Sequence, residues 1–128
     1  MKRKIGLFLA IIILFGTGTV VYAGYKAGTY YNGDVALTCS ISCGYSEGVS
    51  TTRGAPYGKR QTARIYIYGS SGGSLGYNSV NMPYDFVAYA SKSSTSTVYS
   101  AKSYHFVTDT YGNPEYPWYQ QVELATTP

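Results

Sequence analysis

The residues best suited to chemistry are scarce in this 128-residue chain, which holds two cysteines and a single histidine. Cys39 and Cys43 bound the sequence Cys-Ser-Ile-Ser-Cys. On a straight strand their Cα atoms would lie about 13 Å apart, whereas a disulfide needs a separation below about 7 Å. Two cysteines usually pair in an exported protein, and the N-terminal segment described below predicts export. We therefore expect a disulfide between Cys39 and Cys43 and a turn of the chain near Gly44. Buried free thiols are the alternative.

Neither redox chemistry nor metal binding fits these residue types. The cysteine spacing differs from the Cys-x-x-Cys of redox proteins. Two cysteines and one distant histidine do not complete a closed zinc site. We therefore expect no metal and no cofactor.

His105 is the one imidazole available for acid–base work. Ser103 lies two positions before it, and Asp85 and Asp109 are the nearest acids along the chain. Residues i and i+2 of a strand stand about 7 Å apart, too far for a serine–histidine hydrogen bond. We therefore interpret His105 as a core or interface residue bonded to the backbone. A small hydrolase centred on His105 is the competing hypothesis.

Two further patterns only resemble catalytic ones. The sequence Gly69-Ser70-Ser71-Gly72-Gly73 matches G-x-S-x-G. A nucleophile elbow needs a helix after that turn and a larger α/β sheet, so we expect a flexible hairpin loop. Glu115 and Glu123 lack the local setting of a glycosidase pair. The sequence thus predicts a protein that is not an enzyme.

Basic and aromatic residues are interleaved in one part of the chain, which comprises Arg53, Tyr57, Lys59, Arg60, Arg64, Tyr66 and Tyr68. Tyrosine and arginine favour recognition surfaces because they combine stacking, cation–π contact and hydrogen bonding. The predicted binding site consists of Arg64, Tyr66 and Tyr68 with Tyr57, Lys59 and Arg60. The alternative is a solvated loop beside an outward tyrosine ladder that stabilises the sheet.

A second aromatic cluster has the sequence Tyr116-Pro117-Trp118-Tyr119. We expect Trp118 to close one end of the core and Tyr116 and Tyr119 to be partly exposed. A binding platform is the alternative.

The elements that must position these residues are predicted to be β-strands. Residues 24–128 contain 15 Tyr, 12 Gly and 25 Ser or Thr, but only 15 Leu, Ile, Val or Phe. No stretch shows helical periodicity, and turn residues recur regularly. Since tyrosine buries a large area and favours strands, we expect tyrosine rings to bind two pleated layers together. A disordered adhesive chain is the alternative.

Seven strands are predicted, at 28–31, 35–41, 61–68, 75–82, 86–91, 97–107 and 118–125. Seven short antiparallel strands fit two packed sheets, so the expected fold is a small β-sandwich, with an irregular small β-barrel as the alternative. Asn32-Gly33 predicts a tight turn. The glycine-rich segment 42–58 shows no clear periodicity and is expected to be a loop.

Alternation along three strands predicts which side chains face the core. In the strand at 61–68 the inward residues are Ala63, Ile65 and Ile67. In the strand at 97–107 burying unpaired Lys102 would be costly, so the inward residues are Tyr99, Ala101, Ser103, His105 and Val107. In the last strand the shared face consists of Trp118, Gln120, Val122 and Leu124.

Residues 1–23 differ from the rest of the chain. Three basic residues at 2–4 precede an apolar run at 5–15, and Ala23 offers a small residue for cleavage before Gly24. This pattern predicts a cleavable secretory signal peptide, one domain at 24–128 and a secreted protein. An uncleaved membrane anchor is the alternative. Without this segment, seven Lys or Arg stand against six Asp or Glu, so the overall charge of +4 is no argument for nucleic-acid binding.

We therefore expect a small exported non-enzymatic recognition protein that acts at or near the cell envelope through aromatic and basic surface residues. Its partner would be an envelope glycan, an anionic polymer or another protein, and not a nucleic acid. It would meet the membrane only through the transient signal peptide. The alternative is a secreted bacteriocin-like or toxin-like antagonist of other cells.

Overall fold

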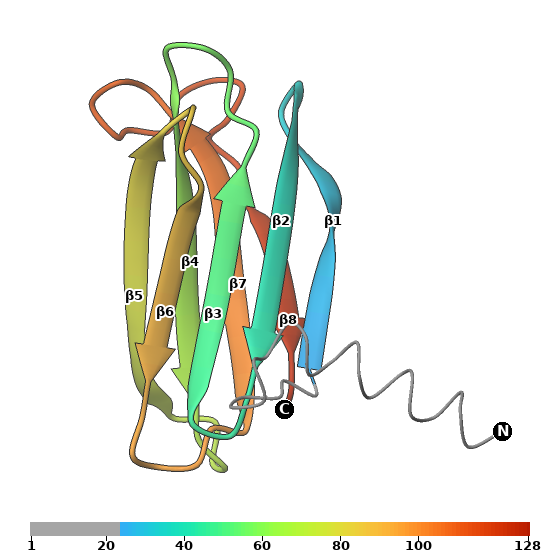
Figure 1. The fold of residues 1–128 in the computed structure, drawn as a ribbon, viewed down its shortest axis with the longest axis vertical. Helices are drawn as coiled ribbons and strands as arrows, with labels where there is room; N and C mark the ends of the chain where they lie inside the picture. The colour runs from blue at the N-terminus through green and yellow to red at the C-terminus, as the bar shows by residue number, and fades with distance from the viewer. Residues whose placement is uncertain (1–23) are drawn as a thin grey trace, which may run out of the picture.

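The computed structural model describes residues 24–128, and these residues contain eight β-strands. The strands are β1 (Gly24–Asn32), β2 (Val35–Cys43), β3 (Glu47–Arg53), β4 (Arg60–Tyr68), β5 (Ser74–Pro83), β6 (Ala88–Ser93), β7 (Ser100–Thr108) and β8 (Val122–Thr126). They form two antiparallel sheets, with the order β1-β2-β3-β6 in sheet A and β5-β4-β7-β8 in sheet B (Figure 1). The expected all-β class is confirmed.

The predicted signal peptide, residues 1–23, lies outside the described residues. Among the residues that are described, no helix is long and apolar enough to cross a membrane.

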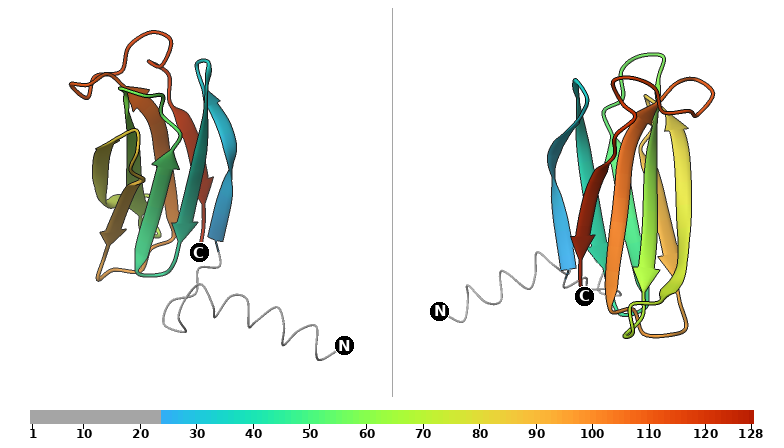
Figure 2. Two further views of the ribbon diagram at one scale, coloured as in Figure 1. Left: turned by 45° about the horizontal axis from the view of Figure 1, so that its top comes forward. Right: turned by 180° about the vertical axis from the view of Figure 1, so that it is seen from behind.

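The two sheets lie against each other (Figure 2). They share one cluster of buried side chains. Sheet A contributes Leu37, Cys39, Ile41, Cys43, Ala88 and Ala90, and sheet B contributes Ala63, Ile65, Ile67, Ala101, Val107 and Leu124. The predicted inward face of β4 is therefore confirmed. These side chains are aliphatic or small, so the core forms by ordinary apolar burial between two pleated faces.

Tyrosine does not build this core, and the expectation that it would is wrong. Eleven of the tyrosines between residues 24 and 128 are exposed, and Tyr30 is the one that packs against the core cluster from a partly buried position. A buried phenol needs a partner for its hydroxyl group. The residues between the sheets are mostly apolar, and the polar groups of Thr52, Ser103 and His105 bond one another. The phenol rings lie outside, where water solvates the hydroxyl.

Strand β3 was not predicted, because its residues fall in the segment 42–58 that we expected to be a loop. It is a central strand of sheet A, paired with β2 on one side and β6 on the other. Gly48, Ser50 and Thr52 are buried and face the core, where small side chains let the two sheets approach closely. Because glycine, serine and threonine alternate with other small or polar residues, the period of two is hidden in the sequence.

The other strands match their predicted positions to within a few residues. The inward face of β7 is confirmed at Ala101, Ser103, His105 and Val107, but Tyr99 precedes the strand and is 54% exposed. The last strand is shorter than predicted and begins only at Val122. Of the residues expected on its inner face, Trp118 and Leu124 are buried, Val122 is partly buried and Gln120 is exposed.

Four connections meet at one end of the sheets, and we call this region the loop end (Figure 1). It consists of residues 33–34, 54–59, 84–87 and 109–121. The predicted turn at Asn32-Gly33 is confirmed: Gly33 has a φ of 63°, and a Cβ atom there would lie 2.6 Å from the Pro117 carbonyl oxygen. Glycine is thus required both by the turn and by the close approach of the β7–β8 connection.

Candidate functional site

The outer face of sheet B carries most of the predicted binding residues. Along β4 the core-facing residues alternate with outward ones, so Arg60, Arg64, Tyr66 and Tyr68 share the outer face. The pairing of β4 with β5 and β7 adds neighbours that lie far away in sequence. The resulting surface, which we call the basic–aromatic face, consists of Arg60, Arg64, Tyr66, Tyr68, Tyr77, Lys102, Tyr104 and Phe106.

Tyr66 is at the centre of the rings on this face. Its ring stacks on Tyr77, with centroids 5.2 Å apart and an interplanar angle of 20°, and it meets Tyr104 edge-on at 5.6 Å. The Arg64 guanidinium lies over the Phe106 ring, 5.3 Å from its centroid. These contacts hold flat aromatic and guanidinium surfaces in fixed positions across three strands.

The charge of this face is positive. Arg64 Nε donates a hydrogen bond to Ser79 Oγ at 3.3 Å, which orients the guanidinium without neutralising it. Lys102 lies 3.6 Å from the Glu123 carboxylate. Of the residues that β4, β5, β7 and β8 place on this face, Glu123 is the single acid, against three cations.

Arg60 is held in place by hydrogen bonds, and the hydroxyl group of Tyr68 is kept protonated. Arg60 Nη2 donates a hydrogen bond to the Asn81 carbonyl oxygen at 3.2 Å, and its Nε also bonds the Asn81 side chain. Burial, with the neighbouring Tyr104, raises the pKa of Tyr68. Tyr68 therefore presents a neutral hydroxyl group at neutral pH, which suits hydrogen bonding to an anion.

Tyr57 and Lys59 lie elsewhere, so the structure divides the predicted site in two. Both belong to the β3–β4 connection at the loop end. Lys59 Nζ lies 3.0 Å from Glu115 and 5.1 Å from the centroid of the Trp118 ring. The Tyr57 ring packs against Tyr84 at 5.1 Å. Arg60, the first residue of β4, stands where the two regions meet.

Trp118 closes the loop end of the core, as expected. Its side chain belongs to the buried cluster and is 9% exposed, and its indole Nε1 donates a hydrogen bond to Asp34 at 3.2 Å. Tyr116 and Tyr119 are more open than expected, with 82% and 59% of their surface exposed.

The expected disulfide is absent, because Cys39 and Cys43 are both free and buried. Strand β2 runs straight through both positions, and the turn comes after Cys43, where the Gly44 amide donates to the Glu47 carbonyl oxygen. Both thiols face the core as small apolar groups. Burial raises the pKa of Cys39 to about 12 and that of Cys43 to about 11, so neither is a reactive thiolate.

His105 is fully buried and has a hydrogen bond with the backbone of Thr51, as expected, but two hydroxyl groups also contact its ring. The Ser103 hydroxyl lies 2.7 Å from His105 Nε2, and the Thr52 hydroxyl lies 2.7 Å from Nδ1. The estimate of 7 Å applies to the backbone positions, whereas the two side chains converge above the strand. Since the imidazole is sealed between the sheets, this serine–histidine contact has no access to a substrate.

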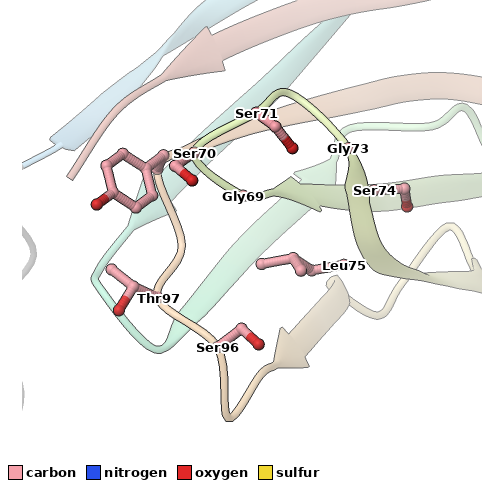
Figure 3. A pocket seen from close by; sticks show the side chains of 9 residues that line it. Gly69, Ser70, Ser71, Gly73, Ser74, Leu75, Ser96 and Thr97 are labelled. Atoms are coloured by element: carbon pink, nitrogen blue, oxygen red, sulfur yellow. The ribbon is translucent and has the colours of Figure 1, made fainter.

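The G-x-S-x-G segment forms the hairpin between β4 and β5, as expected, and no helix follows it. It borders a shallow hollow together with residues of the β6–β7 connection (Figure 3). The hollow is lined by Gly69, Ser70, Ser71, Gly73, Ser74, Leu75, Ser96, Thr97 and Tyr99. These residues include hydroxyl groups but no imidazole, carboxylate or amine, so none of them can activate a serine.

Four residues of the basic–aromatic face were not predicted: Tyr77, Lys102, Tyr104 and Phe106. Alternation along a strand predicts which of its residues share a face. It does not predict that β5 and β7 lie on either side of β4, and only this order brings the four residues beside β4. The chain matches no protein-family model, and no curated protein is significantly similar to it. The proposed function therefore depends on the chemistry of the basic–aromatic face alone.

Proposed function

We propose that this protein is a small exported β-sandwich without enzymatic activity, and that it binds an anionic polymer of the cell envelope through its basic–aromatic face. One observation carries the proposal: sheet B places three cations and four tyrosine rings on a single outer face beside one carboxylate, with Phe106 buried under Arg64. The sealed position of His105 and the neutral buried thiols support a role without catalysis.

The face suits a linear polyanion better than a compact ligand. Outward residues of one strand repeat about every 7 Å, and neighbouring strands lie about 5 Å apart, so the cations are spread over a flat surface and do not converge on a pocket. Arginine offers a planar set of donors to phosphate or carboxylate groups. Because Arg64 is already held over Phe106, its side chain loses little conformational freedom when it binds such a group.

The test is retention of the purified protein, expressed from the full chain, on a column carrying poly(glycerol phosphate). We expect binding at low salt and release as the salt concentration rises, because ions screen exposed charges within about 10 Å at 0.1 M. Replacing Arg64, Tyr66 and Tyr68 together by serine should weaken binding at least about tenfold, since arginine and tyrosine dominate the energy of recognition surfaces.

A matched control uses the same residue types on the outer face of sheet A, where Arg53, Tyr31 and Tyr89 are exposed. Replacing these three by serine should change the retention less than about twofold. Thermal melts of both variants verify that they fold. The proposal fails if the unmodified protein passes through the column at low salt, or if the two variants are retained equally.

A further inference from the structure

The loop end carries a second set of exposed rings, and we infer that it is a separate binding site for a neutral glycan. This site is independent of the polyanion face proposed above, because it lies on the connections and not on the outer face of sheet B (Figure 1). Its chemistry also differs, as the following observations show.

Aromatic rings gather at the loop end with an unusual degree of exposure. Tyr57 is 85% exposed and Tyr111 is 88% exposed, alongside the open rings of Tyr116 and Tyr119. A group of exposed rings on one small region marks an interaction surface, whereas single exposed rings need no explanation. The opposite end has Tyr45 and Tyr99, which serve below as a comparison.

Tyr116 and Tyr119 form the flattest part of this surface. Their rings are nearly parallel, with an interplanar angle of 27° and centroids 6.1 Å apart. The C–H groups on one side of a pyranose ring make a flat, slightly positive apolar surface, which complements the negative face of a phenol ring. A nearly parallel pair offers such flat faces.

Charge argues against an anionic ligand here. The segments of the loop end contain Lys59 as their one cation and four acids, namely Asp34, Asp85, Asp109 and Glu115. Lys59 is already engaged, because it bridges to Glu115 and lies over Trp118. Even with Arg53 and Arg60, which bound the β3–β4 connection, the region has no excess of positive charge that would attract polyanions or anionic lipids. Sugar hydroxyl groups can donate hydrogen bonds to its carboxylates.

Two of the connections are held together by one buried amide. Gln61 Oε1 accepts a hydrogen bond from the Ala55 amide at 2.9 Å, and Gln61 Nε2 bonds the carbonyl oxygens of Pro83 and Phe86. Gln61 thereby fixes the β3–β4 and β5–β6 connections, which carry Tyr57 and Tyr84. Their rings are ordered before a ligand arrives, which lowers the entropic cost of binding.

The long β7–β8 connection is fixed in a similar way. The Asp109 carboxylate accepts hydrogen bonds from the amides of Tyr111 and Asn113, at 2.8 and 2.9 Å. The Asn32 side chain bonds the Gln120 carbonyl oxygen and accepts a hydrogen bond from the Val107 amide at 2.8 Å. The platform of Tyr116 and Tyr119 therefore lies on a connection anchored at both of its ends.

The test uses Trp118, the single tryptophan of the chain, as a probe that lies at the proposed site. The protein expressed from the full chain is titrated with cellohexaose, chitohexaose and maltohexaose, each up to about 10 mM, a concentration tenfold above a millimolar Kd. We expect at least one of these to change the emission of Trp118 saturably. High salt should leave that Kd unchanged to within about twofold, since no charge on the sugar is screened.

Substitutions of the tyrosines at each end of the sheets show which rings the sugar contacts. Tyr116→Ala combined with Tyr119→Ala should raise the Kd at least about tenfold, and Tyr116→Ala alone gives the same comparison if the double variant does not fold. The control is Tyr45→Ala combined with Tyr99→Ala at the opposite end, where the two rings are 69% and 54% exposed. This control should leave the Kd unchanged.

Calorimetry in parallel detects binding anywhere on the protein. Heat of sugar binding that is unchanged by Tyr116→Ala combined with Tyr119→Ala would place the sugar elsewhere and overturn the inference. It is also overturned if none of the three sugars binds, or if vesicles of zwitterionic phosphatidylcholine change the emission while the sugars do not, because the rings would then belong to a membrane-contacting surface.

Discussion

At the scale of single residues, His105 shows how burial removes a group from acid–base chemistry. Its two nitrogens contact the hydroxyl groups of Thr52 and Ser103, which act as donor or acceptor as each nitrogen requires. Burial lowers the pKa of His105 to about 4, and a hydrogen bond with the Thr51 backbone only partly opposes that effect. The imidazole is therefore neutral in the folded protein at neutral pH.

This pKa predicts acid sensitivity. The pKa is about 4 in the folded state and about 6.5 in the unfolded chain, so the unfolded chain binds more protons between these values. The stabilising contribution is complete above pH 6.5 and falls as the pH decreases to 4. We expect it to amount to about 3 kcal/mol of unfolding free energy between pH 7 and pH 4.

Urea unfolding at several pH values measures this contribution when the unmodified protein is compared with His105→Gln. The glutamine cannot be protonated, whereas all other titrating groups are the same in both proteins. The difference between the two slopes of unfolding free energy against pH is therefore due to His105. Equal slopes for the two proteins would contradict the assignment.

At the scale of elements, β3 shows how a central strand is built from small residues. Gly48 faces sheet B, and a Cβ atom at this position would lie 2.7 Å from Ile67 Cγ2 and 3.2 Å from Ile65 Cγ1. The close approach of β3 to β4 thus depends on the missing side chain. Ser50 and Thr52 continue the same inward row.

We predict that Gly48→Val lowers the free energy of unfolding by about 1–3 kcal/mol, since it overpacks the contact with β4. Valine has the higher strand propensity, so the sign of the effect separates packing from propensity. Thr51→Val, on the outer side of the same strand, should cost less than about 1 kcal/mol. If Gly48→Val proved neutral in urea unfolding, the segment would be a loop and β3 would be wrong.

At the scale of the whole molecule, aliphatic and aromatic residues have separate tasks. The aliphatic and small side chains fill the space between the sheets, and the tyrosines cover the outside. The basic–aromatic face and the loop end consequently expose rings that are not required to hold the sheets together. The core therefore supplies the stability, and the exposed rings are available for the binding proposed above.

The division predicts that stability depends on the aliphatic core. Ile65→Ala should lower the unfolding free energy by about 2–5 kcal/mol, because it leaves a cavity between the sheets. Tyr89→Ala removes a larger side chain, but one that is 55% exposed, and should cost less than about 1 kcal/mol. Chemical denaturation of both variants checks this prediction. A larger loss of unfolding free energy for Tyr89→Ala than for Ile65→Ala would show that tyrosine side chains stabilise the fold as core residues do.

Patterns in the amino-acid sequence alone predicted the local features of this protein. Period-two alternation predicted the inner residues of β4, glycine and asparagine predicted the turn at 32–33, and six further strands were placed approximately. These features depend on neighbours along the chain. Alternation states which side chains share a face, and turn residues state where a strand ends.

The order of the strands in each sheet could not be predicted from such local patterns. The order β5-β4-β7 brings Tyr77, Tyr66 and Tyr104 together, while Tyr57 and Lys59 go to the loop end. The tertiary structure likewise decided that the cysteines remain unpaired and that tyrosine lies outside. Pairing depends on contacts between residues far apart in sequence, and the burial of a phenol or thiol depends on the partners that the opposite sheet offers, neither of which a local pattern contains.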